Sequence, residues 1–65
     1  MKTYFLLVVE KYDNGAVRMT VYDRKRAKLP SNDSLKRPGV VFEHHWFETL
    51  GAAEAAKKEL EGRKI

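Results

Sequence analysis

The chain contains no cysteine, which excludes a disulfide framework and a metal site built on thiolates. No stretch approaches the ~20 consecutive apolar residues that a membrane-spanning helix needs. With 65 residues, the chain has room for one small domain, residues 1–65. A core of that size leaves no room for a large active-site cleft, which disfavours an enzyme. These absences favour a soluble, non-enzymatic protein with no membrane segment and no cofactor.

The N-terminus resembles a signal peptide only superficially. Lys2 precedes an apolar run from Tyr4 to Val9, but charged residues follow at once and no small-residue cleavage site is present. We therefore expect an intact cytoplasmic chain in which the apolar run is a strand.

The first half of the chain predicts a β-hairpin. Residues 3–12 and 16–23 are rich in aromatic and β-branched types, and Asn14-Gly15 lies between them. Asn-Gly favours a two-residue type I′ turn. That turn would place Tyr12 opposite Val17 and Val8 opposite Val21.

In this register one sheet face collects the residues expected to form the core: Tyr4, Leu6, Val8, Val17, Met19 and Val21. The opposite face collects Phe5, Leu7, Val9, Lys11, Arg18, Thr20 and Tyr22.

The second half predicts a third strand and a helix. The strand covers residues 40–48, and Thr49 can cap a helix over residues 50–61 that Gly62 would stop. Ala52, Ala53, Ala56 and Leu60 form its apolar stripe. The predicted fold class is α+β, a single β-β-β-α domain with a three-stranded antiparallel sheet and one C-terminal helix on one face. A simple meander puts the second strand in the middle, whereas the apolar character of the first strand favours that strand as the centre.

The positive charge is concentrated in residues 24–39, which we expect to form a long loop. This segment holds one acid, Asp33, and has a net charge of +5, although the whole chain carries only +4. Clustered cations favour phosphate backbones, while the alternative is a solvated loop. The basic residues of the segment are Arg24, Lys25, Arg26, Lys28, Lys36 and Arg37.

The orientation of the third strand leaves two alternatives. We prefer Val40, Phe42, His44 and Trp46 toward the core, because that set has no charged member. In the opposite orientation Phe42, His44 and Trp46 join Phe5, Arg18 and Tyr22 on an open face, where aromatic rings and an arginine can stack unpaired bases.

An apolar patch of Phe5, Leu7, Val9 and Tyr22 remains on the second sheet face in either case. Such a patch is typical of a protein interface, including that of a homodimer. The loop around Leu29-Pro30 and Leu35, or Ile65, could equally cover it.

No catalytic or metal-binding motif stands out. His44 and His45 are adjacent on a strand and therefore point to opposite faces, so they cannot readily chelate one ion.

The end of the third strand and the helix carry a family resemblance. Phe47-Glu48-Thr49, followed by Ala53, Glu54, Ala55, Ala56 and Leu60, resembles the three-stranded-sheet-plus-helix DNA-binding domains of phage and transposon integrases and of plant ethylene-response factors. The resemblance implies a sheet laid in the major groove. It nominates Lys11, Arg18, Thr20 and Tyr22 on the free face, with Arg24 and Arg26 beyond it.

The sequence thus predicts a non-enzymatic nucleic-acid-binding module, with DNA favoured over RNA, that uses the basic segment and the free sheet face. The alternative is a small protein-binding or inhibitory accessory protein that uses the apolar face.

Overall fold

A computed structural model describes residues 1–63 of the chain. Four strands precede one helix: β1 (Lys2–Tyr12), β2 (Val17–Arg26), β3 (Asp33–Arg37), β4 (Val40–Phe47) and α1 (Leu50–Arg63). The α+β class, the antiparallel sheet and the C-terminal helix are confirmed, but the prediction of three strands is wrong. The covering role considered for Ile65 lies outside the described residues.

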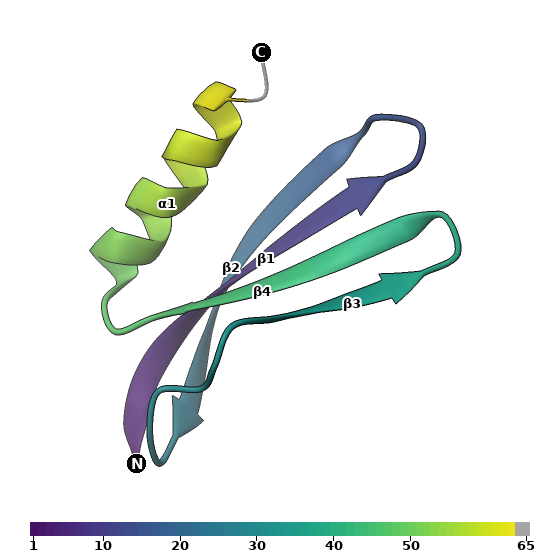
Figure 1. The fold of residues 1–65 in the computed structure, drawn as a ribbon. Coiled ribbons are helices and arrows are strands. Elements are labelled where there is room, and N and C mark those ends of the chain that lie inside the picture. Colours follow the sequence, from purple (N-terminus) through teal and green to yellow (C-terminus); the bar gives the residue numbers. More distant parts are fainter. Residues whose placement is uncertain (64–65) are drawn as a thin grey trace.

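The strand order across the sheet is β2-β1-β4-β3 (Figure 1). β1 lies inside the sheet between β2 and β4, as its apolar character on both faces predicts. Residues 27–32 link β2 at one edge to β3 at the other, around the end of the sheet where the N-terminus lies (Figure 1).

The hairpin between β1 and β2 exists, but its turn is not the predicted type I′. Gly15 donates a backbone hydrogen bond to the Tyr12 carbonyl oxygen at 3.0 Å, and Tyr12 donates one to the Ala16 carbonyl oxygen at 2.9 Å. Gly15 has a φ of 91°, and in residues 1–63 no residue other than glycine has a positive φ. Asn14 therefore cannot occupy a type I′ position. The geometry is that of a three-residue loop, a turn closed by a left-handed glycine.

This loop shifts the register by one residue relative to the prediction. Val17 pairs with Lys11 rather than Tyr12, and Val21 pairs with Leu7 rather than Val8. Because side chains alternate along a strand, a one-residue shift exchanges the two faces of β1 relative to β2.

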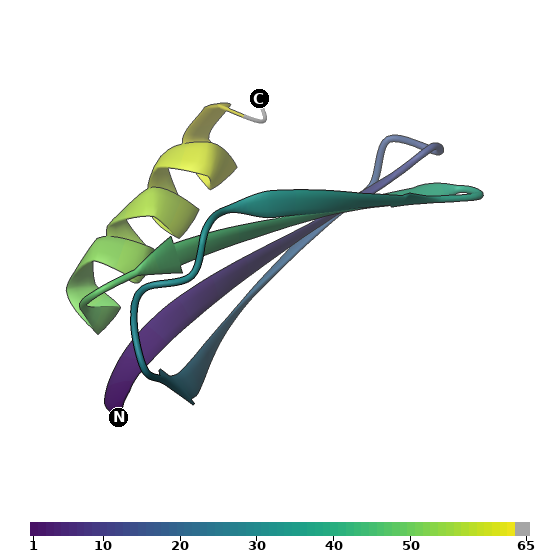
Figure 2. The ribbon, with the colours of Figure 1, turned by 60° about the horizontal axis from the view of Figure 1, so that its bottom comes forward.

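The core lies on the side of β1 that the sequence analysis left free. Leu7 is 0% exposed and Val9 is 1% exposed. Helix α1 lies against this side of the twisted sheet, which we call the covered face (Figure 2). The opposite side, which no helix covers in the described residues, is the open face. The predicted core positions Leu6 and Val8 are half-buried on the open face, so that prediction is wrong for them. Tyr4 lies on the same face but is only 5% exposed, as a core residue should be. The predicted core residues of β2, Val17, Met19 and Val21, lie on the covered face.

Helix α1 begins where the sequence predicts. The Ala52 backbone N–H donates to the Thr49 hydroxyl at 3.1 Å, the bond expected of an N-terminal cap. Ala53 is fully buried, whereas Ala52 is exposed. The predicted stop at Gly62 is wrong, since the helix runs to Arg63.

Half of the predicted loop over residues 24–39 is strand. β2 continues to Arg26, and β3 pairs with β4 through a tight turn at Pro38-Gly39. Gly39 has a φ of 82°, which matches the second central position of a type II turn after proline. Only residues 27–32 remain as a connection. No helix in the described part of the chain is long and apolar enough to cross a membrane.

Candidate nucleic-acid interface

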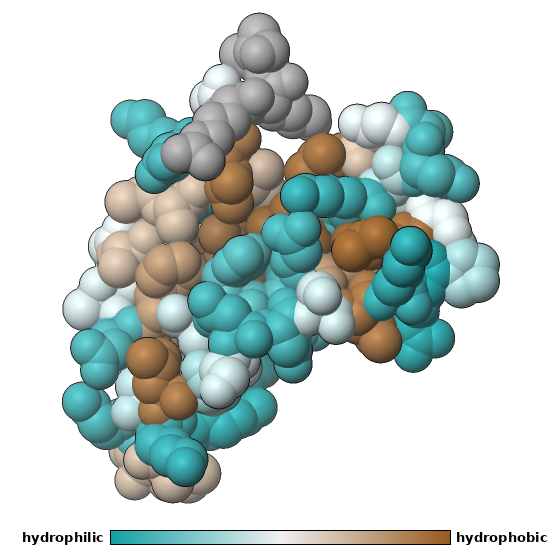
Figure 3. Space-filling model, viewed as in Figure 1, coloured by the Kyte–Doolittle hydropathy of each residue, from teal (hydrophilic) through white to brown (hydrophobic). Residues whose placement is uncertain are grey.

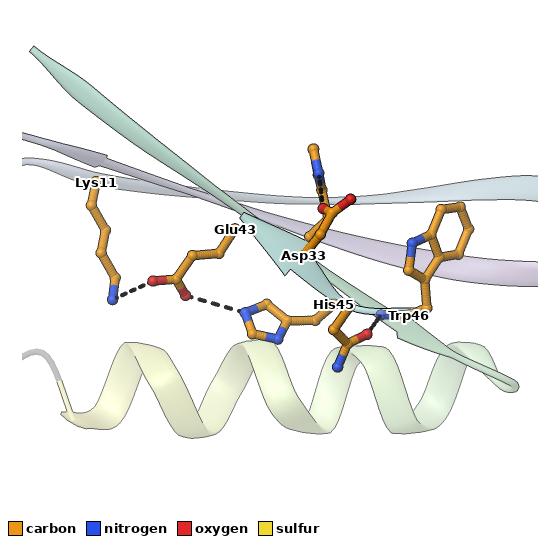
Figure 4. A network of polar contacts seen from close by, with 7 residues as sticks. Lys11, Asp33, Glu43, His45 and Trp46 are labelled. Carbon is orange, nitrogen blue, oxygen red and sulfur yellow. Dashed lines mark hydrogen bonds and ion pairs between the residues drawn. The ribbon is translucent and has the colours of Figure 1, made fainter. Parts of the chain in front are cut away.

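The covered face carries a polar network beside the helix (Figure 4). Lys11 Nζ lies 2.9 Å from Glu43 Oε2, and His45 Nε2 lies 3.2 Å from Glu43 Oε1. The contact with Lys11 lowers the pKa of Glu43, with a further contribution from His45. These three side chains satisfy one another next to α1, so they serve the fold.

The open face combines aromatic rings with cations. Strand pairing places Leu6 between Tyr22 and Trp46, and Tyr4 beside Arg24. Further along the same face, Glu10 lies between Arg18 and Phe42, and Tyr12 pairs with Val40. This face therefore presents both flat apolar surface and positive charge.

The preferred orientation of strand 40–48 is wrong. His44 pairs with Val8 and Trp46 with Leu6, so both lie on the open face. The alternative orientation is confirmed for Phe42, His44 and Trp46, but Phe5 lies on the covered face, opposite Phe47. The two histidines do point to opposite faces, since His44 contacts Asp33 and His45 contacts Glu43.

Three cation–aromatic pairs lie at the end of the open face near the N-terminus. The Arg24 guanidinium carbon is 5.0 Å from the centre of the Tyr22 ring, and that of Arg26 is 5.6 Å from the Trp46 ring. Lys2 Nζ is 6.0 Å from the Tyr4 ring. Distances of this size are typical of cation–π contacts. We call this group the cation–aromatic cluster: Lys2, Tyr4, Tyr22, Arg24, Arg26 and Trp46.

Strand alternation builds the cluster. Tyr22, Arg24 and Arg26 occupy every second position of β2 and therefore share one face. Arg26 pairs with Lys2 on β1, yet its guanidinium reaches Trp46 on β4. The arginine side chain thus spans the width of β1 at this end of the sheet.

The cations of the cluster are not neutralised by acids. No ion pair joins Lys2, Arg24 or Arg26 to a carboxylate in residues 1–63. Arg24 and Arg26 instead donate to neighbouring backbone carbonyl oxygens at 2.7 Å. Because both arginines are exposed, their positive charge remains available to an anion.

The acids of the open face are already engaged. Glu10 accepts a hydrogen bond from the Tyr12 hydroxyl at 2.9 Å, which raises the pKa of Tyr12. Asp33 lies 2.8 Å from His44 Nδ1. Glu10 lies toward the other end of the sheet, and Asp33, which is nearer the cluster, is in contact with His44 rather than with a cation of the cluster.

Of the residues predicted for nucleic-acid binding, the structure brings only some together. Arg18, Thr20, Tyr22, Arg24 and Arg26 share the open face of β2. Lys11 is on the covered face, in contact with Glu43.

The other predicted cations are dispersed. Lys25 pairs with Thr3 on the covered side, Lys28 lies in the 27–32 connection, and Lys36 pairs with Val41 on the covered side. Arg37 is on the open face but at the opposite end, where β3 turns into β4. The expected single basic loop is therefore not present.

The predicted protein interface is also divided. Leu7 and Val9 are buried and Phe5 is half-buried on the covered face, while Tyr22 is 40% exposed on the open face. These four residues do not form one accessible patch.

Sequence reasoning missed Lys2 and Tyr4 as members of the cluster. The period-two spacing of Tyr22, Arg24 and Arg26 could have revealed them, because it indicates that β2 continues as far as Arg26, the residue that pairs with Lys2. Figure 3 shows the hydropathy of one side of the molecule. Brown is concentrated in a strip beside the helix and around the β3–β4 hairpin, and hydrophilic side chains cover much of the remainder (Figure 3).

Within residues 1–63, no group of three or more metal-ligating side chains occurs. Comparison of the chain with known protein families, with curated proteins and with solved structures finds no significant match.

Proposed function

We propose that this chain is a non-enzymatic nucleic-acid-binding module whose binding surface is the open face of the sheet. The observation that carries the proposal is the cation–aromatic cluster, in which exposed arginines have no carboxylate partner among the described residues 1–63. Unpaired arginines attract phosphates and release the counterions that surround a nucleic-acid backbone.

The distribution of charge on the sheet supports this surface over the covered face. On the open face, Arg18 lies 4.0 Å from Glu10, and Asp33 is engaged with His44. The other cations of this face have no carboxylate partner among residues 1–63: Lys2, Arg24, Arg26 and Arg37. On the covered face, Lys11 is already paired with Glu43 and α1 occupies the apolar middle.

A protein-binding function through Phe5, Leu7 and Val9 is not proposed. A partner would have to displace α1 to reach Leu7, which is fully buried. A homodimer through the same patch is not proposed either, because α1 covers the same residues.

The test is a titration of a fluorescently labelled DNA oligonucleotide, followed by anisotropy, at several salt concentrations. We expect the logarithm of the affinity to fall linearly with the logarithm of the salt concentration. Replacing two phosphate-contacting arginines, Arg24→Gln with Arg26→Gln, should make the slope shallower by about 1.4 to 1.8, since each contact contributes about 0.7 to 0.9.

A charge-matched control uses Lys25→Gln with Lys58→Gln. Lys25 lies next to both arginines in sequence but on the covered side, and Lys58 is exposed on α1. The control should change the slope by less than half as much. Equal changes in the two double variants, or no binding at low salt, would contradict the proposed surface.

A further inference from the structure

We propose that the ligand of the open face is a single-stranded nucleic acid whose bases stack at Tyr22 and Trp46. This inference rests on the proposed function and names the substrate class of the same site. The observations that carry it are the position of the two rings, the chemistry between them and the width of the sheet.

The two rings are spaced for unstacked bases. Tyr22 and Trp46 both pair with Leu6, from opposite sides. Two inter-strand steps separate their backbones by roughly 10 Å. Neighbouring bases in a regular duplex strand are only about 3.4 Å apart, and their faces are hidden against each other. Rings at the wider spacing can be used only by bases splayed out of a stack.

The residue between the rings supports the same conclusion. Leu6 is half-buried and apolar, and Val8 follows it on the same face. Reading base edges in a groove requires hydrogen-bonding side chains such as arginine, asparagine or glutamine at these positions. An apolar floor instead matches the faces of bases, which stack on aromatic and aliphatic surface.

The guanidinium groups are placed to extend a stack of bases on the two rings. Arg24 lies over Tyr22 and Arg26 over Trp46. A guanidinium plane stacks on a base as well as on a ring, and its N–H groups can reach the adjoining phosphate. Each ring and its arginine therefore offer one site for a base and a charge for its backbone.

The sheet is too wide for the major groove of a duplex. That groove is about 12 Å wide and accepts a helix or a two-stranded ribbon. Where β3 pairs with β4, beside the cluster, the four strands span roughly 14 Å between the axes of the outer strands, before side chains are added. The cluster itself lies beyond the start of β3, so it is the width of the neighbouring sheet that would make the open face rest across a duplex rather than enter it.

The test compares three labelled DNA ligands of equal length: a single strand of mixed sequence, its duplex, and an abasic strand with the same phosphates. At about 0.15 M salt, where charges more than ~8 Å apart are screened, we expect the single strand to bind at least tenfold more tightly than the abasic strand. It should also bind more tightly than the duplex.

Variants of Tyr22 locate the stacking. Tyr22→Ala should weaken single-strand binding at least fivefold, and Tyr22→Phe, which keeps the ring, should restore most of the affinity. Tyr12→Ala is the matched control, because Tyr12 is a comparably exposed aromatic residue on the same face but at the far end of β1. We expect it to change the affinity less than twofold.

Trp46 provides a second readout that does not depend on a variant. It is the only tryptophan of the chain, so quenching of its fluorescence by the unlabelled single strand, without quenching by the abasic strand, would support the inference. Equal affinities for single, duplex and abasic strands, with a salt slope that still depends on Arg24 and Arg26, would overturn the inference and leave the proposed function in place. If none of the three ligands binds, both the inference and the proposed function are overturned.

Discussion

The backbone N–H of Asp13 donates a hydrogen bond to the carbonyl oxygen of Gly39 at 3.1 Å, and this bond joins the tips of the two hairpins. The two loops come from opposite halves of the chain, and each depends on a glycine with positive φ, Gly15 or Gly39. The hairpin tips are therefore fixed by local backbone conformation and by one direct link between them.

Replacing either tip glycine should destabilise the protein. Gly15→Ala has open space for its methyl group, and in Gly39→Ala the nearest atom would be Asp13 Oδ2 at an ordinary 3.8 Å. The cost then comes from the left-handed backbone, about 1 to 2 kcal/mol for each variant. Urea unfolding followed by circular dichroism measures it. Gly51→Ala, in the helix with no contact within 4 Å, should not destabilise the protein. Equal losses for Gly15 and Gly51 would contradict the role of the positive φ.

Leu7 and Leu6 test the observed register directly. Leu7 is fully buried beneath α1, whereas Leu6 is half-buried on the open face. Leu7→Ala should cost about 2 to 5 kcal/mol, a large share of the stability of a domain this small. We expect Leu6→Ala to cost clearly less in the same thermal or urea unfolding experiment. The reverse order would indicate the register that the type I′ turn implies.

The cap of α1 is worth a measurable part of the stability. Thr49→Ala removes the hydroxyl that accepts the Ala52 N–H and should cost about 1 kcal/mol. Thr49→Ser keeps the hydroxyl and should retain most of that stability. A lower midpoint of urea unfolding for the alanine variant alone would support the cap, and equal midpoints for both variants would argue against it.

The pair of Glu43 and Lys11 should make stability depend on pH. Their contact lowers the pKa of Glu43 in the folded state. The resulting stabilisation is complete above the unfolded pKa of about 4.3, and it is lost as the pH falls through the lower, folded value. Both side chains are partly exposed, so their contact should contribute about 1 kcal/mol or less to the free energy of unfolding.

Glu43→Gln measures this contribution. The stability difference between the original protein and this variant should shrink as the pH falls from 7 toward 3, because the original protein loses the same ionised contact. Glu48→Gln removes an exposed carboxylate that has no ion pair among residues 1–63, and it should show no comparable trend. A difference for Glu43→Gln that stays constant over this range would contradict the prediction.

The sequence predicted the elements better than it predicted which face each residue occupies. The hairpin and the Thr49 cap follow from local signals that compete with nothing else, and the apolar character of β1 correctly favoured its inner place over a simple meander. Asn14-Gly15 is different, because it suits both a two-residue turn and a three-residue loop with glycine in the left-handed region. β1 is apolar on both faces, so its pattern cannot decide between the two.

Only part of the candidate site was predicted, because here too the face of each residue decides which side chains come together. Arg18, Tyr22, Arg24 and Arg26 alternate on β2 and share a face in either register. Trp46 depends on the orientation of β4, where burial preference suggested the core and the structure places it on the open face. The short strand β3 is exposed throughout and gave no hydrophobic signal, so its pairing with β4 could not be foreseen.

The exposed tip at residues 13–15 has an influence out of proportion to its size. Deleting a single residue there would turn one of the two strands over relative to the other: either Leu7 and Val9 would leave the covered face, or Tyr22, Arg24 and Arg26 would leave the open face. Sequence changes that preserve the length of this tip should therefore be tolerated far more readily than those that alter it.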